Sequence, residues 1–144
     1  MVSGSGTGAG VIRRLTLAGF DVSAGALAHG DTDHEVASTL GVPMVELQPY
    51  GGISEADETA VGSAARKADV VVVCATPFGH ANVGNLRAAA GAARPTVLVG
   101  ELTAEDDFTD VEASALWSDL LSRGARACTG TRYVVRAVEE ANRS

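Results

Sequence analysis

Short runs of β-branched residues alternate along the chain with alanine-rich stretches of helical length. The clearest run, DVVVVCA at residues 69–75, is apolar at every position from Val70 to Ala75, and PTVLVG at residues 95–100 is a second. A strand that is apolar on both faces is typical of the covered centre of a parallel sheet. Residues 20–27, 43–47 and 125–128 predict three further strands, the last of them at an edge. Strands that alternate with helices indicate βαβ units.

The stretches between these runs predict six helices, because their apolar residues recur at three- and four-residue spacing. Asp33 and Thr131 are the predicted caps of the second and sixth helices, since short polar side chains favour that position. Gly19, Gly41 and Gly124 follow predicted helix ends, where glycine readily adopts a left-handed backbone. The predicted buried stripes are Val36, Ala37 and Leu40 on the second helix, Ala60, Val61, Ala64 and Ala68 on the third, and Leu116, Trp117 and Leu120 on the fifth.

The pattern predicts an α/β fold, a three-layer Rossmann-like domain with a doubly wound, mainly parallel sheet of five to six strands. A chain of 144 residues with 46% hydrophobic and 20% charged residues is long enough for one core. We therefore expect a single domain over residues 1–144. Only Met1–Ser3 precede the first glycine turn, where a strand normally has ~5 residues. This favours a fragment of a longer chain.

Charge and composition narrow the classes of partner. The formal net charge of −7 disfavours nucleic acid, whose phosphates need clustered Lys and Arg, and it disfavours an anionic membrane surface. The longest apolar run, Val70–Ala75, is too short to span a bilayer, so no direct membrane insertion is expected. Cys74 and Cys128 stand in apolar, strand-like segments, as reduced core thiols of a cytosolic protein do. We expect a cytoplasmic protein.

A glycine-rich segment, GSGTGAG at residues 4–10, lies between the first predicted strand and helix. The backbone N–H groups of such a turn approach a phosphate closely, and the helix N-terminus adds partial positive charge. The alternative is that the glycines only let strand and helix pack closely. The segment is no P-loop, because Gly-Lys-Ser/Thr does not follow. The predicted cofactor-binding residues here are Gly4, Ser5, Gly6, Thr7 and Gly10.

A carboxylate after the second strand holds the ribose in dinucleotide-binding folds. Asp31 is the predicted ligand for a sugar hydroxyl, whereas Asp33 is better placed as a helix cap. Together with His29 and His34, these two aspartates also form a cluster of potential metal ligands. Two histidines five residues apart across a turn do not share a helix face, so we predict no metal.

The segment TPFGHANVGN at residues 76–85 directly follows the buried valine strand. In a doubly wound sheet this loop lies beside the glycine turn, where ligands bind. His80 could donate a hydrogen bond or move a proton, and Asn82 and Asn85 offer donors and acceptors without ionising. The alternatives are an exposed loop histidine and asparagines that cap the next helix. The predicted binding residues are Pro77, Phe78, Gly79, His80, Asn82 and Asn85.

Four segments together resemble a known family. They are Gly4-Ser5-Gly6…Gly10, Gly30-Asp31-x-Asp33…Val36-Ala37…Leu40-Gly41, Pro77-Phe78-Gly79…Asn82…Asn85-Leu86 and Ala115-Leu116-Trp117-x-Asp119-Leu120-x-x-Arg123-Gly124-Ala125. This order is similar to the accessory domain that follows the ATPase module in ABC-type importers of corrinoids and iron chelates such as siderophores and haem. The resemblance implies a Rossmann-like domain on the cytoplasmic side of such a transporter, with the ATPase module in the same chain. No ATP-hydrolysing residue of that family maps onto this sequence.

The sequence leaves three hypotheses for the function. The first is an accessory or regulatory domain that binds a small nucleotide-like or anionic cofactor, a nucleotide or dinucleotide among them. The second is a small enzyme, either an NAD(P)-binding oxidoreductase or a corrinoid-modifying transferase, although no Ser, Cys or Lys stands near a base at a recognised spacing. The third is a docking or dimerisation module whose crevice is empty, and in the dimerisation case the chain would form a homodimer.

Overall fold

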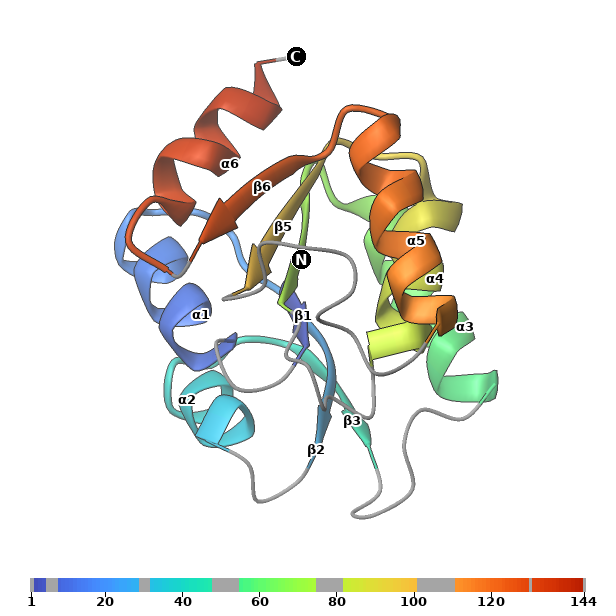
Figure 1. The fold of residues 1–144 in the computed structure, drawn as a ribbon. Coiled ribbons are helices and arrows are strands. Elements are labelled where there is room, and N and C mark those ends of the chain that lie inside the picture. The colour runs from blue at the N-terminus through green and yellow to red at the C-terminus, as the bar shows by residue number, and fades with distance from the viewer. Residues whose placement is uncertain are drawn as a thin grey trace.

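The structure is a computed structural model that describes residues 2–4, 8–28, 32–47, 55–74, 82–100, 111–129 and 131–143. Strands and helices alternate throughout these residues (Figure 1). The strands are β1 Val2–Gly4, β2 Ala24–Ala28, β3 Met44–Leu47, β4 Val71–Cys74, β5 Thr96–Gly100 and β6 Arg126–Thr129. The helices are α1 Gly8–Leu17, α2 Thr32–Thr39, α3 Glu55–Lys67, α4 Asn82–Ala92, α5 Val111–Ser122 and α6 Val134–Asn142. The predicted α/β class is confirmed.

The described strands form one sheet in the order β3-β2-β1-β4-β5-β6. Every pair in it is parallel, and Val2 of β1 lies opposite Ala24 of β2 on one side and Val72 of β4 on the other. The order changes direction between β1 and β4, because the chain adds strands outward on one side of β1 and then on the other. β6 is an edge strand, as predicted.

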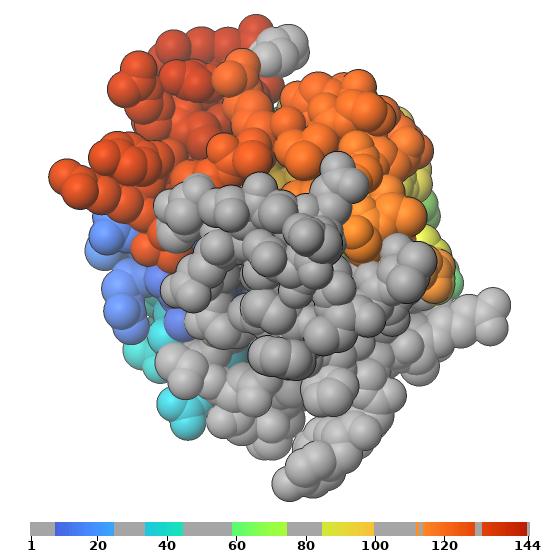
Figure 2. Space-filling model, viewed as in Figure 1, coloured from blue at the N-terminus to red at the C-terminus, as the bar shows by residue number. Residues whose placement is uncertain are grey.

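Helices cover both faces of this sheet (Figure 1). α1, α2 and α6 contribute to one buried cluster, and α3, α4 and α5 contribute to the other. In the space-filling view, α1 and α2 (blue to cyan) lie below α6 (red) on the left, while α5 (orange) lies on the right (Figure 2). The sheet is therefore the shared middle layer of two cores.

β4 shows how one strand serves both cores. Val71 and Val73 pack in the cluster on the α3–α4–α5 side, whereas Val72 and Cys74 pack in the cluster on the opposite side. Successive side chains of a strand point to opposite faces, so a strand covered on both faces must be apolar at every position. This explains the unbroken VVVVC run that predicted a central strand.

Several details of the helices differ from prediction. α6 begins at Val134 with Tyr133 as its N-cap residue, so Thr131 does not cap it. α2 begins at Thr32, which places Asp33 inside the helix rather than at its cap. Leu40 follows the end of α2 and is 37% exposed, because the helix ends before the apolar stripe reaches it. Ala60 of α3 is exposed, and Ala65 is buried instead.

Three helices end just before the glycines that the sequence predicted as stop signals. Gly19, Gly41 and Gly124 have φ values of 92°, 70° and 97°, which residues with a Cβ rarely adopt. Each glycine follows a helix and turns the chain toward the next strand. The predicted stop signals are confirmed at all three positions.

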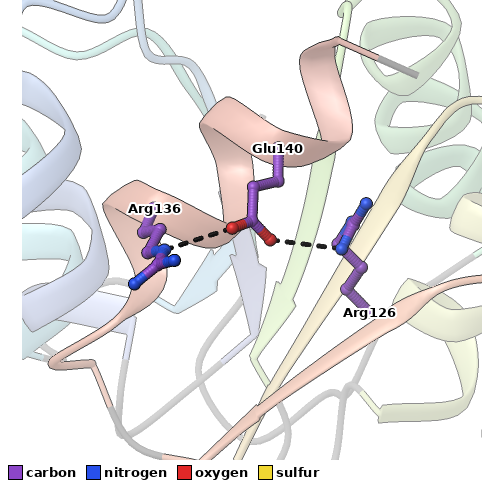
Figure 3. Close-up of polar contacts among 3 residues, drawn as sticks. All are labelled: Arg126, Arg136 and Glu140. Atoms are coloured by element: carbon purple, nitrogen blue, oxygen red, sulfur yellow. Dashed lines mark hydrogen bonds and ion pairs between the residues drawn. The ribbon is translucent and has the colours of Figure 1, made fainter.

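Ion pairs hold the last helix against the edge strand. Glu140 of α6 accepts hydrogen bonds from Arg126 of β6 at 3.2 Å and from Arg136, one turn earlier in α6, at 3.1 Å (Figure 3). The buried side of the same helix consists of Val134, Val138 and Ala141. α6 is thus fixed by apolar burial on one side and by paired charges on the other.

Candidate functional site

The carboxyl ends of β1 and β4 lie side by side in the sheet. Gly4, the last residue of β1, is opposite Cys74, the last residue of β4. α1 follows β1 and begins at Gly8, and α4 follows β4 and begins at Asn82. Two helices on opposite faces of the sheet therefore start from neighbouring strand ends at the point where the strand order changes direction. Open parallel sheets bind ligands at this place.

The described residues include four of the predicted binding residues. Gly4 ends β1, Gly10 is in the first turn of α1, and Asn82 and Asn85 are in the first turn of α4. The remaining predicted binding residues lie outside the described residues, namely Ser5, Gly6, Thr7, Asp31, Pro77, Phe78, Gly79 and His80.

Gly10 has a structural reason to be glycine. A Cβ at this position would come within 3.2 Å of Cγ2 of Thr131, which is tighter than an ordinary contact. Thr131 lies just before α6, and α1 and α6 are in contact. Close approach of α1 to the segment before α6 therefore gives Gly10 a packing reason, which differs from the strand–helix packing that the sequence left open.

Asn85 is the most unusual polar residue of this edge. Its side chain is 1% exposed, and neither the Oδ1 nor the Nδ2 atom has a hydrogen-bond partner. It is the fourth residue of α4, so the predicted alternative of a helix cap is wrong. Its neighbour Leu86 is fully buried in the core, which fixes this turn of the helix. Buried carboxamides nearly always have partners, and each exception needs an explanation.

The helix dipoles add a second property to this edge. α1 and α4 both begin at this edge, and the N-terminus of a helix carries partial positive charge. Acidic residues are absent from the first turns of both helices. Nothing within these two turns therefore neutralises the positive ends, and they favour an anion or the negative end of a dipole.

The suggested metal cluster is not assembled in the described residues. His34 and Asp33 both lie in α2, and His34 is 7% exposed. Among the residues that the structure describes, no group of three His, Cys, Asp or Glu side chains could hold a metal ion. His29 and Asp31 lie outside these residues.

The two cysteines are buried, as predicted. Burial raises the pKa of the Cys128 thiol, and the backbone N–H of Tyr133, which donates a hydrogen bond to it, lowers the pKa by less. A raised pKa leaves Cys128 as an unreactive thiol at neutral pH. Cys74, the last residue of β4, is 1% exposed. Buried thiols of this kind are typical of structural cysteines.

A cavity of about 390 Å³, which the sequence did not predict, lies at the opposite, amino edge of the sheet. It is lined by residues from three helices and from the segments that lead into β2, β3 and β4. Its lining mixes buried apolar residues such as Leu15 and Val72 with polar ones such as Asp21, Lys67 and Asp69, and no sequence motif marks them. In the part of the chain that the structure covers, no helix has the length and apolar character needed to cross a membrane.

Comparisons with known proteins give the chain a family and a relative. The sequence profile of the MJ0874 family matches residues 22–135. The cobalamin import ATP-binding protein BtuD from two strains of Halobacterium salinarum is 34% identical to the chain over 112 residues, which is 76% of this chain and 27% of BtuD. The chain thus spans about a quarter of the length of the curated relatives that it matches. No solved structure matches it significantly.

Proposed function

Because the chain belongs to the MJ0874 family and is similar to part of a cobalamin import ATP-binding protein, we propose that it is an accessory domain of an ABC-type importer of cobalamin or an iron chelate. In this proposal the domain follows the ATPase module in one longer chain and lies beside the transporter on the cytoplasmic side. The chain covers 27% of BtuD, which supports its being one domain of a larger protein.

The proposed fold is Rossmann-like. The strand order 3-2-1-4-5-6 with parallel pairing is the order of doubly wound, dinucleotide-binding sheets. Helices lie on both faces, and α1 to α5 each join one parallel strand to the next, which supports the same assignment. Fold alone does not give function, so the proposed activity rests on the site.

The proposed activity is binding of a small nucleotide-like or anionic cofactor at the carboxyl ends of β1 and β4. The observation that carries it is Asn85, whose buried carboxamide has a free donor and a free acceptor in the first turn of α4. A ligand could pair with both atoms at once, as a carboxamide does with the edge of a nucleobase. The helix N-termini would hold the anionic part, together with residues 4–7 and the loop that contains Pro77–His80.

A thermal-shift experiment tests this proposal. The chain is melted with millimolar NAD(H), NADP(H), ATP, ADP and cobalamin in separate samples. A ligand at 100 times its Kd stabilises the folded state by about 2.7 kcal/mol, so at least one of these should raise Tm by several degrees. No shift with any of them would overturn ligand binding and favour a docking module.

Two substitutions locate the binding site. Asn85→Leu removes both polar atoms and should abolish the ligand-dependent shift. Thr16→Val is the matched control, because Thr16 also has a buried oxygen without a partner but lies near the other end of α1. It should leave the shift intact. Equal shifts in the two variants would remove Asn85 from the site.

A further inference from the structure

Positive charge is concentrated on one side of the molecule. Six of the eleven Lys and Arg residues of the chain lie on or beside α1, β6 and α6, and all six are exposed, namely Arg13, Arg14, Arg126, Arg132, Arg136 and Arg143. The same segments, residues 8–17, 126–129 and 131–143, contain two acidic residues, Glu139 and Glu140. Six arginines against two glutamates give these segments a net charge of +4. Since the whole chain carries −7, the remaining residues together carry −11.

α1 and α6 present these arginines on one surface. Both helices pack in the same buried cluster, contact each other and lie in one layer over the sheet (Figure 1). Arg13 and Arg14 are on the exposed side of α1. Arg136 and Arg143 are seven residues, or about two turns, apart on the exposed side of α6. We call the outer surface of α1, β6 and residues 131–143 the basic face.

Other side chains neutralise only part of the charge of the basic face. Arg126 and Arg136 share the carboxylate of Glu140 (Figure 3). In the described parts of the chain, the other four arginines of the face have no ion-pair partner. The guanidinium of Arg132 instead lies 5.4 Å from the centre of the Tyr133 ring. The basic face therefore presents exposed, unpaired cations to any negatively charged surface that approaches it.

Two apolar side chains project from the same face. Leu17, the last residue of α1, is 77% exposed, and Tyr133, just before α6, is 58% exposed. They are the most exposed large hydrophobic residues in the described part of the chain. Cations that pair with lipid phosphates, combined with leucine and aromatic side chains that enter the headgroup region, are typical of surfaces that bind membranes peripherally.

The negative charge of the whole chain does not prevent such binding. The Debye length is about 10 Å in 0.1 M salt. α3, α4 and α5 lie beyond the sheet, behind α1 and α6, and one helix is itself about 10 Å thick. Their charges are therefore largely screened from a surface that touches the basic face. Exposed Asp21, after α1, and exposed Glu35, on α2, border the face and limit the contact to α1, α6 and the β6 edge. The net charge alone, from which the sequence predicted no affinity for anionic membranes, does not show this separation.

From this distribution we propose that the basic face binds the phosphate groups of anionic lipids, with Leu17 and Tyr133 as shallow apolar contacts. An acidic protein fits the face less well, because protein interfaces gather their apolar anchors near the centre. Here the turn at Thr131 touches Gly10 in the first turn of α1, which places Tyr133 near that end, whereas Leu17 is at the other end. A helix of ten residues is about 15 Å long, so the arginines lie between two separated apolar contacts.

Sedimentation with lipid vesicles tests the proposal. The chain is mixed with vesicles that contain about 40% phosphatidylglycerol in phosphatidylcholine, or with pure phosphatidylcholine vesicles. In about 0.1 M NaCl we expect at least tenfold stronger partition into the anionic vesicles, and most of this difference should disappear in about 0.5 M NaCl, because salt screens the charges. No partition, or equal partition into both kinds of vesicle, would overturn the proposal.

Matched charge changes locate the surface. One cation near an anionic membrane strengthens binding about fivefold, so the double change Arg13→Gln and Arg14→Gln should weaken partition about 25-fold. The control is Arg66→Gln with Lys67→Gln, which removes two adjacent exposed charges from the last turn of α3, beyond the sheet. It should leave partition nearly unchanged. Equal losses in the two double variants would indicate unspecific attraction and remove the basic face as the binding surface.

Two further measurements separate a membrane from an acidic protein. Leu17→Ala should weaken partition into anionic vesicles about threefold, since a leucine side chain is lost from the headgroup region. A polyglutamate peptide offers carboxylates without lipid, and we expect the chain to bind it much more weakly than the anionic vesicles. Tighter binding to the peptide than to the vesicles would assign the face to an acidic protein instead. All these samples lack cofactors, so their outcome is independent of the thermal-shift panel.

Discussion

A buried carboxamide without hydrogen-bond partners destabilises a folded protein by about 1–3 kcal/mol, and Asn85 is such a residue. Replacing it with leucine, which has a similar shape, removes the unpaired atoms. We therefore expect Asn85→Leu to raise the free energy of unfolding by about 1 kcal/mol in the absence of ligand, measured by urea denaturation. A gain in stability with a loss of binding is typical of functional residues. A destabilised Asn85→Leu chain would show that the carboxamide has a structural role.

Gly10 and Thr131 should be energetically coupled, because a Cβ on Gly10 would press on Cγ2 of Thr131. Alanine is favoured over glycine inside a helix by about 1 kcal/mol. In the native background the close contact should cancel most of this gain. In a Thr131→Ser background, which lacks Cγ2, Gly10→Ala should stabilise the chain by about 0.5–1 kcal/mol more than in the native background. Additive effects in this double-mutant cycle would contradict the packing role of Gly10.

The buried thiol of Cys128 makes stability depend on alkaline pH. Its pKa is raised in the folded state by desolvation, so the folded chain holds this proton more tightly than the unfolded chain does. The contribution is complete below the ordinary thiol pKa of 9.0 and is lost as pH rises through the higher folded value. Urea midpoints between pH 8 and 10.5 should therefore fall less steeply in Cys128→Ala than in the native chain. Parallel curves would assign the alkaline loss to other groups.

At the scale of elements, the contact between α6 and the edge strand β6 depends partly on charge. Glu140 accepts hydrogen bonds from Arg126 and Arg136, and all three side chains are substantially exposed. Exposed ion pairs contribute about 0–1 kcal/mol and weaken with salt. Glu140→Gln should lower the free energy of unfolding by about 0.5 kcal/mol at low salt, and by less in 1 M NaCl. A loss that salt does not reduce would indicate packing rather than charge.

The sequence was informative about the kinds of elements and less so about where they end. Residues 69–75 and 20–27 were predicted as strands, and the structure has β4 over Val71–Cys74 and β2 over Ala24–Ala28. Val22 and Ala24 are both apolar and buried, whereas a strand also needs a hydrogen-bonded neighbour, which the pattern of one segment does not contain. The predicted helix caps were wrong for a similar reason. Thr32, Asp33 and Thr131 are all residue types that favour a helix start, so residue type alone does not fix where the helix begins.

The candidate site, too, could be predicted from the sequence only in part. Asn85 was predicted from its place after a buried strand, but its lack of partners depends on packing by distant elements and is visible only in the structure. Gly10 was predicted for a ligand, and the structure explains it by contact with a residue 121 positions later in the chain. The cavity at the amino edge has no sequence signal, since its lining comes from six separate elements and lead-in segments.

At the scale of the whole molecule, two cores share one sheet. β4 and β5 place side chains in both clusters, so neither cluster can lose its order without exposing the shared strands. Trp117, the single tryptophan, is 4% exposed in the cluster on the α3–α4–α5 side. Its fluorescence should therefore report unfolding that begins on the far face as well, in one cooperative transition.

Ile12→Val tests this coupling across the sheet. Ile12 is fully buried in the cluster opposite Trp117, and loss of one methyl group there costs about 1 kcal/mol. For a domain of this size the loss should lower Tm by about 3 °C, equally by Trp117 fluorescence and by far-ultraviolet circular dichroism. Leu17→Ala is the control on the same helix, since Leu17 is 77% exposed and its truncation should change Tm little. If fluorescence keeps its native midpoint while dichroism shifts, the two cores unfold independently, and the sheet does not join them into one cooperative unit.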